Sequence, residues 1–461
     1  MVNTLVFLSF IIIIYFSILW VGYLGLLLGT FSAVIRKYQE SENNTIFSTY
    51  GLHEVLPMTL IIPAYNEAKR ILSAVTSILN SDYQDIHLII VNDGSTDTMV
   101  QVLLDTYAFK EIPPAFRQTI PTGAVRAYYR SEMVPNFTLI DKVHSPFANS
   151  GADCINAGLN ICTTPVFLTI DADTLLEEKA LSQMLFMYLT HPHCVAVGGD
   201  IYVPDTIKMK DGKVTETNIP SNFVLGVQVC EYLRSFSYGR EGWSLIGGAL
   251  CFPGAFTLLE TKAVWDIGGY DSSNFSYDAE IIIRLHHEMR KNHYPYSMVY
   301  APSAICWSEE PSTLIGLWKQ RNKWQRGLLR CLGRHLGMLF NPRYGIVGLL
   351  GFPYYVLFEI FGPAVEAFSY LLFIVAYCIG AISIVPLAWL ICLAWGYMWV
   401  ITMSCVVLNV LTYNVYYRKM DIVRIFGLTT IDMMFYRQWR AFCALFSSIQ
   451  YVVNRLRGKC Q

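Results

Sequence analysis

The sequence predicts an α/β protein with a mostly parallel sheet, joined to an α-helical transmembrane region. Three observations support this fold class. The composition is 54% hydrophobic, which exceeds the usual share in a soluble domain. No charged residue occurs before Arg36 or between Glu366 and Arg418. Between these apolar blocks, short apolar runs alternate with a helical pattern, which is typical of parallel strands covered by helices on both faces.

The first apolar block suits one membrane helix, because a span needs about 20 apolar residues. We expect residues 1–35 to form an uncleaved anchor. A cleaved signal peptide is the alternative, but its apolar core is usually about 7–15 residues and follows basic residues. The second block predicts spans near 367–386 and 388–413, and 344–366 is expected to be re-entrant or interfacial.

Basic residues that flank the apolar blocks predict the orientation of the chain. Arg36 and Lys37 follow the first block, and Arg418 and Lys419 follow the second. Positively charged flanks favour the cytoplasmic side. Three spans therefore place residues 36–343 and the amphipathic tail 418–461 in the cytoplasm.

Strand signals recur in the central region. The runs "MTLIIPAY", "IHLIIVNDGSTD" and "VFLTIDADT" each end in polar or turn residues. Between the first two, helical spacing is shared by Ile71, Leu72, Val75, Ile78 and Leu79. Residues 104–148 are rich in proline and aromatics and are expected to be a long excursion. The segment "KMKDGKVTETN" (208–218) predicts a surface hairpin.

Acidic residues follow the third strand signal. In an open parallel sheet, ligands bind beyond the carboxyl ends of the strands. Asp171 and Asp173 are two residues apart, so on an extended segment both carboxylates point the same way. Their repulsion is relieved by a divalent cation, and oxygen ligands suit Mg²⁺ or Mn²⁺. The alternative is a pair of capping aspartates, with a helix opening at Thr174.

Six segments in order then carry a family resemblance: "TLIIPAYNEAKRI", "IIVNDGSTD", "GADCINAGLN", "FLTIDADT", "YDAEIIIRLHH" and "QRNKWQRG". Together, from about residue 57 to 330, they resemble the processive inverting glycosyltransferases of family 2. These are the membrane-bound synthases of cellulose, chitin, hyaluronan and poly-N-acetylglucosamine. The resemblance implies a GT-A-type fold that binds a nucleotide-diphosphate sugar across the strand ends.

The resemblance also implies site residues. It places Mg²⁺ or Mn²⁺ on Asp171 and Asp173, with the metal on the diphosphate. The implied donor-binding residues are Tyr65, Glu67, Asp93, Asp153, Lys323 and Arg326. The implied acceptor-binding residues are Gly254, Ala255, Gln320 and Trp324.

A candidate base lies in "GGYDSSNFSYDAEIIIRLHH". The family has an acidic pair before a helix, and here the pair reads Tyr277-Asp278. The resemblance implies that Asp278 takes the proton of the acceptor hydroxyl, which is the one base that inversion needs. Glu280 is the second candidate. On local sequence alone, the role of helix N-cap is favoured for Asp278, and the order of the motifs favours the catalytic role instead.

Three positions depart from the family pattern. Gly151 stands where a lysine is common, Tyr277 replaces an acid, and Lys323 replaces an arginine. Lysine keeps the positive charge but loses the two-pronged hydrogen bonding of arginine. None of these changes removes the metal aspartates or the candidate base, so we expect an active enzyme.

The predicted organisation is an anchor (1–35), a cytoplasmic glycosyltransferase domain (36–310), basic amphipathic interface helices (311–343), a membrane region (344–417) and a tail (418–461). The expected activity is transfer from a UDP-sugar to a growing β-linked polysaccharide in the bacterial inner membrane, with N-acetylglucosamine as the favoured sugar. The alternatives are single addition to a lipid-linked acceptor, or a non-catalytic subunit that binds sugar nucleotides. The expected partners include the lipid bilayer. Nucleic acid is not expected, because the basic run from Lys319 abuts membrane spans.

Overall fold

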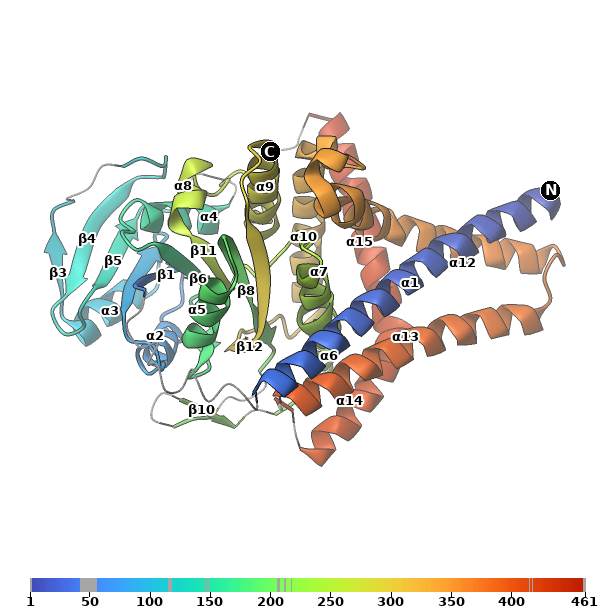
Figure 1. Cartoon of the computed structure of the whole chain (residues 1–461), viewed down its shortest axis with the longest axis horizontal. Helices are drawn as coiled ribbons and strands as arrows, with labels where there is room; N and C mark the ends of the chain where they lie inside the picture. The colour runs from blue at the N-terminus through green and yellow to red at the C-terminus, as the bar shows by residue number, and fades with distance from the viewer. Residues whose placement is uncertain are drawn as a thin grey trace.

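The computed structural model describes residues 2–41 and 56–458, apart from 115–117, 146, 148, 205–207, 211–212, 217, 414 and 417. An α/β domain lies at one end, and long helices project from its other side (Figure 1). The predicted fold class is confirmed, because a sheet with a parallel core is joined to apolar helices.

Ten strands form one mixed sheet in the order β3-β4-β5-β2-β1-β6-β11-β8-β12-β7. Their bounds are β1 Met58–Ala64, β2 Ile86–Asn92, β3 Phe109–Ile112, β4 Val125–Ser131, β5 Phe137–Lys142, β6 Val166–Ile170, β7 Leu175–Leu176, β8 Cys194–Tyr202, β11 Phe256–Glu260 and β12 Ser297–Trp307. The central strands β5, β2, β1 and β6 are mutually parallel, whereas β11 runs antiparallel between β6 and β8. The three predicted strands are β1, β2 and β6, which meet at the centre.

Helices cover both faces of the sheet, which explains why its central strands are apolar on both sides. One face carries α2 (Ile71–Leu79), α3 (Met99–Tyr107) and α5 (Ala180–Thr190). The other carries α4 (Ser150–Leu159), α8 (Thr261–Asp266) and α9 (Tyr277–Lys291). In β1, Ile62 packs toward the first group and its neighbour Ile61 toward the second. The helix predicted from the spacing of Ile71 to Leu79 is α2.

The prediction that residues 104–148 form a long excursion from the sheet was wrong. This stretch contains β5, which pairs parallel with β2, and β4 and β3, which continue the sheet to its edge through antiparallel pairs. Strand β4 has no continuous buried run, so its sequence lacks the strand signal of β1 or β2. The predicted hairpin is confirmed by β9 (Lys208–Lys210) and β10 (Lys213–Glu216), which pair antiparallel. Its turn at 211–212 lies outside the described residues.

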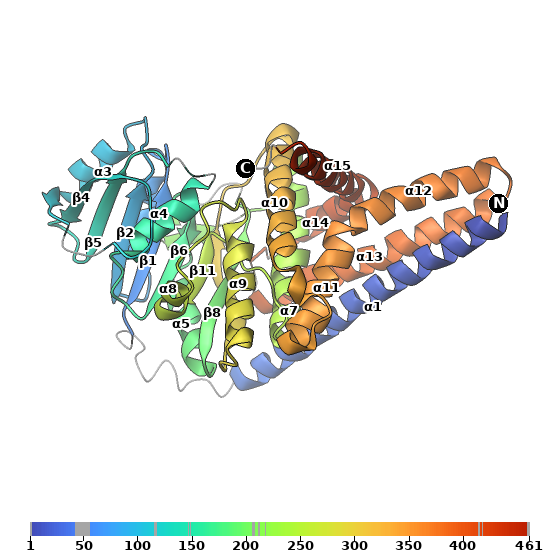
Figure 2. The same cartoon turned by 90° about the horizontal axis from the view of Figure 1, so that it is seen from above.

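Three long helices lie side by side and project from the α/β domain: α1 (Val2–Ser41), α12 (Gly362–Cys378) and α13 (Ile384–Tyr413) (Figure 2). By length and composition, two helices of the described chain can cross a membrane, over Phe7–Ile35 and Ile391–Val410. A third crossing exists if Val347–Ile360 and Gly362–Cys378, bent by 45°, form one span. This bent pair is where the sequence predicts an interfacial segment and a span.

A layer of helices separates the sheet from the projecting helices. It contains α6 (Phe223–Tyr232), the π-helix η3 (Leu233–Arg240) and α7 (Glu241–Leu245), which follow one another without a break. It also contains α10 (Leu314–Arg334) and the run of α14 (Lys419–Ile431), η8 (Asp432–Tyr436) and α15 (Arg437–Leu456). Between α10 and α12 lie the short elements η4 (Leu336–Met338), η5 (Pro342–Tyr344), η6 (Val347–Gly351), α11 (Phe352–Tyr354) and η7 (Tyr355–Ile360). Helices α10 and α15 pack along each other, across the direction of the projecting helices (Figure 1).

Candidate active site

A cavity of about 560 Å³ lies beyond the carboxyl end of β6, among α9, α10 and the projecting helices. It brings together many of the residues predicted for the site. Its lining includes Asp171, Asp173, Gly254, Ala255, Asp278, Gln320, Lys323 and Trp324. The candidate metal, base and acceptor residues therefore share one space, although they come from four separate parts of the chain.

Asp171 and Asp173 occupy the turn between β6 and the short strand β7. No helix begins at Thr174, since the chain enters β7 there and α5 starts only at Ala180. The capping alternative for this pair was therefore wrong. Burial raises the pKa of Asp171 to about 6, with Glu310 and Asp278 adding repulsion. Burial and the charge of Asp171 raise the pKa of Asp173 to about 7.

The two aspartates fit a divalent cation whose other ligands come from a substrate and from water. Within the described ranges, no group of three or more His, Cys, Asp or Glu side chains is arranged to hold a metal. Mg²⁺ is commonly held by one or two carboxylates together with substrate phosphates and water, so it needs no all-protein cage. Two mutually repelling carboxylates at a cavity wall match that requirement.

Asp278 lies at the start of α9 but is not its N-cap. The cap residue is Ser276, and Asp278 is the second residue of the helix. Gly254 passes directly against it, because a Cβ at position 254 would lie 3.2 Å from the Cβ of Asp278. The Ser276 hydroxyl donates to the carbonyl oxygen of Trp324 at 3.4 Å, which holds α10 against the start of α9.

Positive charges partly offset the effect of burial on the pKa of Asp278. Burial raises its pKa, whereas the backbone N–H of Ala279 and the cations Arg240 and Lys323 act in the opposite direction. Lys323 also lowers the pKa of Asp171, so one lysine is electrostatically coupled to the candidate base and to the candidate metal ligand. Sequence reasoning missed Arg240, which lies in η3, outside every motif that carries the family resemblance.

Tyr65, Glu67 and Asp93 form a neighbouring group outside the lining of this cavity. Asp93 follows β2, accepts a hydrogen bond from the Ser145 N–H at 2.9 Å and pairs with His144 at 2.8 Å. The ring of His144 lies 5.1 Å from that of Tyr65. Glu67 is close enough to raise the pKa of both metal-candidate aspartates. This group therefore borders the acidic pair at the ends of β1 and β2.

Three other candidates are engaged elsewhere. Asp153 is fully buried in an ion pair with Lys142, and it also accepts the Gly123 N–H at 2.9 Å. Glu280 pairs with Arg284 at 2.9 Å and does not line the cavity. Arg326 lines a separate pocket on another side of α10.

Two of the departures from the family pattern face each other. A Cβ at Gly151 would lie 3.6 Å from the ring atom Cε1 of Tyr277. The tyrosine ring therefore lies beside the glycine, on the side where a longer side chain at 151 would begin. The two changes are far apart in the sequence but are neighbours in the structure.

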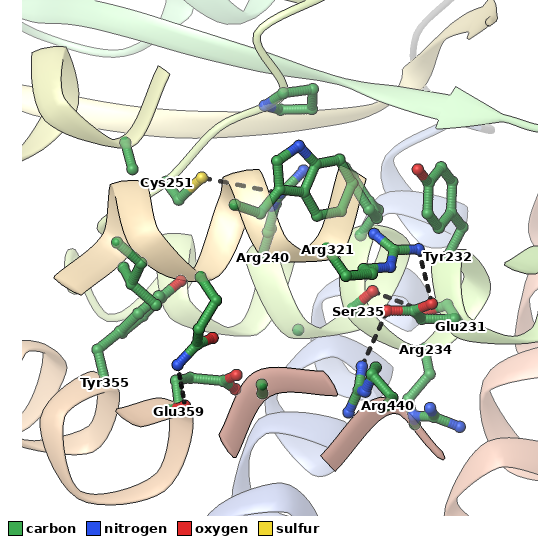
Figure 3. A pocket seen from close by; sticks show the side chains of 18 of the residues that line it. Glu231, Tyr232, Arg234, Ser235, Arg240, Cys251, Arg321, Tyr355, Glu359 and Arg440 are labelled. Carbon is green, nitrogen blue, oxygen red and sulfur yellow. Dashed lines mark hydrogen bonds and ion pairs between the residues drawn. The ribbon is translucent and has the colours of Figure 1, made fainter. Parts of the chain in front are cut away.

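Sequence reasoning also missed a buried ion-pair network at the cavity wall. Glu231 of α6 accepts hydrogen bonds from Arg321 at 2.9 Å, Arg440 at 2.9 Å and Tyr436 at 2.7 Å. Figure 3 shows Arg321 and Arg440 turned toward the Glu231 carboxylate from two different helices. Close by, Glu310 accepts a hydrogen bond from Gln320 at 2.8 Å. The Glu231 network thus fastens α6, α10 and α15 together.

Replacing Glu231 with Gln is expected to destabilise the fold. Burial alone would raise the pKa of Glu231, but Arg321 and Arg440 lower it from 4.5 to about 2. That shift corresponds to roughly 3 kcal/mol of stability. Because the folded pKa is depressed, this contribution is present above about pH 4.5 and is lost as the pH falls toward 2.

Thermal unfolding in detergent between pH 7 and pH 3 tests this. The wild type should lose stability below pH 4.5, and Glu231→Gln should start lower and change less over that interval. Glu111→Gln, at an exposed residue of β3, is the matched control. Equal melting of wild type and Glu231→Gln at pH 7 would show that the network adds no stability.

The sequence matches a family model and curated relatives. A family model described as "Glycosyltransferase like family 2" matches residues 56–327. The poly-beta-1,6-N-acetyl-D-glucosamine synthase of Staphylococcus epidermidis is 26% identical over 276 residues, covering 59% of this chain and 55% of that protein. The synthase of the same name from Staphylococcus aureus strain COL is 25% identical over 278 residues, covering 60% and 56%. The chain thus spans about half the length of these curated relatives.

A solved structure resembles the whole chain. The mannosyltransferase PcManGT from Pyrobaculum calidifontis, in complex with GDP-Man and Mn²⁺, superposes with a TM-score of 0.52. The match covers 94% of this chain and 99% of that one at 16% identity. At this identity the likeness establishes a shared fold.

Proposed function

The chain belongs to the family 2-like glycosyltransferases, and from that premise we propose that it transfers a sugar from a UDP-sugar, with inversion, to a growing β-linked polysaccharide. The favoured sugar is N-acetylglucosamine, the unit named in the matched synthases. The protein is proposed to sit in a bacterial inner membrane, with its α/β domain in the cytoplasm. Basic residues beside the apolar blocks support this orientation.

The chemistry follows from the charges that line the cavity. We assign the diphosphate of the donor to Asp171 and Asp173 through Mg²⁺ or Mn²⁺, which neutralises charge on the departing nucleotide. Lys323 is proposed to face the same leaving group. Asp278 accepts the proton of the acceptor hydroxyl, while Trp324 and the small residue Gly254 position the acceptor sugar.

The observation that carries the proposal is the continuity of the cavity. The space lined by Asp171 and Asp278 is also lined by Tyr15, Leu19 and Tyr23 of α1. Glu366 of α12 borders it as well. An elongating product that leaves the candidate base can therefore pass directly along the projecting helices. This arrangement favours a polymer over a soluble product.

The proposal is tested by incubating membranes that contain the protein with UDP-N-acetylglucosamine and Mg²⁺ or Mn²⁺. Release of UDP together with a ladder of products is the expected outcome. UDP release with one defined product would indicate single addition to a lipid-linked acceptor. UDP binding without release would indicate a non-catalytic subunit and would overturn the proposal. Mass spectrometry of products from a panel of UDP-sugars identifies the transferred sugar.

A further inference from the structure

A second pocket of about 210 Å³ lies between α10 and α15. Four arginines line it: Arg326, Arg330 and Arg334 from α10, and Arg455 from α15. The aromatic rings of Phe275 and Tyr451 form part of its wall. The three α10 arginines are four residues apart, so they share one face of that helix. The pocket is thus a concave surface with a strongly positive lining.

Acidic side chains compensate little of this charge. Arg334 pairs with Asp271, and no other ion pair of the four arginines occurs among the described residues. Arg330 and Arg334 instead donate to the same Ser273 hydroxyl, at 3.3 and 3.1 Å. Their guanidinium groups are therefore held side by side, although like charges at this spacing destabilise a helix.

Arg326 supplies an independent observation. Its Nε is buried and has no hydrogen-bond partner within the described structure. Its guanidinium lies over the Phe275 ring, 5.5 Å from the ring centre. An aromatic ring is not a strong hydrogen-bond acceptor, so this contact does not satisfy the Nε donor. A buried, unsatisfied donor on a charged group is costly, so a ligand that accepts hydrogen bonds here is favoured.

We propose that this pocket is an anion site that binds a phosphate group. Arginine forks match the oxygen geometry of phosphate, and several converging guanidinium groups bind it more strongly than isolated ones. The ligand is either the headgroup of an anionic phospholipid or a soluble phosphate compound. Helix α10 lies in the layer between the sheet and the helices that project toward the proposed membrane (Figure 1), so we consider both sources.

The pocket is connected to the candidate active site through Phe275. This residue lines both cavities and lies three positions before Asp278. The next residue, Ser276, contacts Gly327 of α10 so closely that a Cβ at 327 would lie 2.1 Å from the Ser276 hydroxyl oxygen. A phosphate held by α10 and α15 therefore fixes the segment that leads into α9 and its candidate base.

The test is isothermal titration of the full-length protein in detergent and EDTA, which suppresses cation-dependent binding at the acidic cavity. The soluble probe is inorganic pyrophosphate, and the lipid probe is dihexanoyl phosphatidylglycerol below its micelle concentration, with dihexanoyl phosphatidylcholine as the uncharged comparison. The variants are Arg455→Gln and the double variant Arg330→Gln/Arg455→Gln. Arg424→Gln, an exposed arginine on α14, is the charge-matched control.

The double variant should weaken binding of the occupying probe by about tenfold or more, because it removes two charge-assisted contacts. The control should bind like the wild type. Loss confined to pyrophosphate identifies a soluble ligand, whereas loss of phosphatidylglycerol binding identifies a lipid headgroup. The proposal is overturned if neither affinity changes, or if Arg424→Gln weakens binding equally. Arg455 is exposed and unpaired in the described structure, so the single variant tests the site without endangering the fold.

Discussion

Replacing Asp278 with Asn should reduce sugar transfer by about a thousandfold, because a general base contributes roughly 10²–10⁴ in rate. The amide keeps the shape of the carboxylate but cannot take up the proton of the acceptor hydroxyl. Donor binding should change by less than about twofold, since Asp278 is proposed to face the acceptor and not the diphosphate. Turnover is measured as UDP release, and donor affinity is measured by titration with UDP-N-acetylglucosamine.

Asp266→Asn, at an exposed residue of α8, is the matched control and should retain full activity. Glu280→Gln separates the two candidate bases, because Glu280 is tied to Arg284 and should not carry the proton transfer. Burial raises the pKa of Asp278, so wild-type activity should fall as the pH decreases through that raised value, since only the carboxylate accepts a proton. Undiminished turnover in Asp278→Asn would refute its role as the base.

Replacing Asp173 with Asn should weaken cation-dependent donor binding and lower activity by about a hundredfold or more. One of two carboxylates at the cavity wall is lost, so a shared Mg²⁺ or Mn²⁺ is held by Asp171 alone. EDTA should reduce the wild type to a similar level and should have little further effect on the variant. Protons compete with the cation, because the pKa of Asp171 is about 6 and that of Asp173 is about 7. Metal affinity should therefore fall between pH 8 and pH 6.

The same substitution should have the opposite effect on stability when the cation is absent. Asp173 is buried beside like charges, so its removal in EDTA should raise the melting temperature by about 2–4 °C for each kcal/mol of repulsion relieved. Asp105→Asn, at an exposed residue of α3, should change neither activity nor melting. A loss of stability in Asp173→Asn would instead indicate that the carboxylate serves the fold.

The core of the fold and the acidic centre could be predicted because their signals are local. Strand β6 is buried along its whole length and apolar except for Thr169, so the position of Asp171 at its carboxyl end follows from the sequence. The helical spacing of α2 is equally direct. Asp278 required the order of motifs as well, because an aspartate near a helix start is common for structural reasons.

The remaining features depend on contacts between distant residues. Strand β4 is held by its neighbours in the sheet, so 104–148 carries no clear strand pattern of its own. Arg326 lies about 200° around α10 from Trp324 at 3.6 residues per turn, so two residues of one motif line different pockets. Glu231 is an acid in an apolar helix, and nothing near it in sequence identifies Arg321 and Arg440 as its partners.

The Glu231 network also constrains when the enzyme becomes competent during its synthesis. Arg440 follows Glu231 by 209 residues, so the ribosome completes the α/β domain long before this counter-ion emerges. Until then, Glu231 in the cavity wall lacks one of its two arginine partners, and α15 cannot pack against α10. The cavity lined by Asp171 and Asp278 is therefore complete only after α15 has been synthesised and has packed against α10, because residues of α15 form part of its lining.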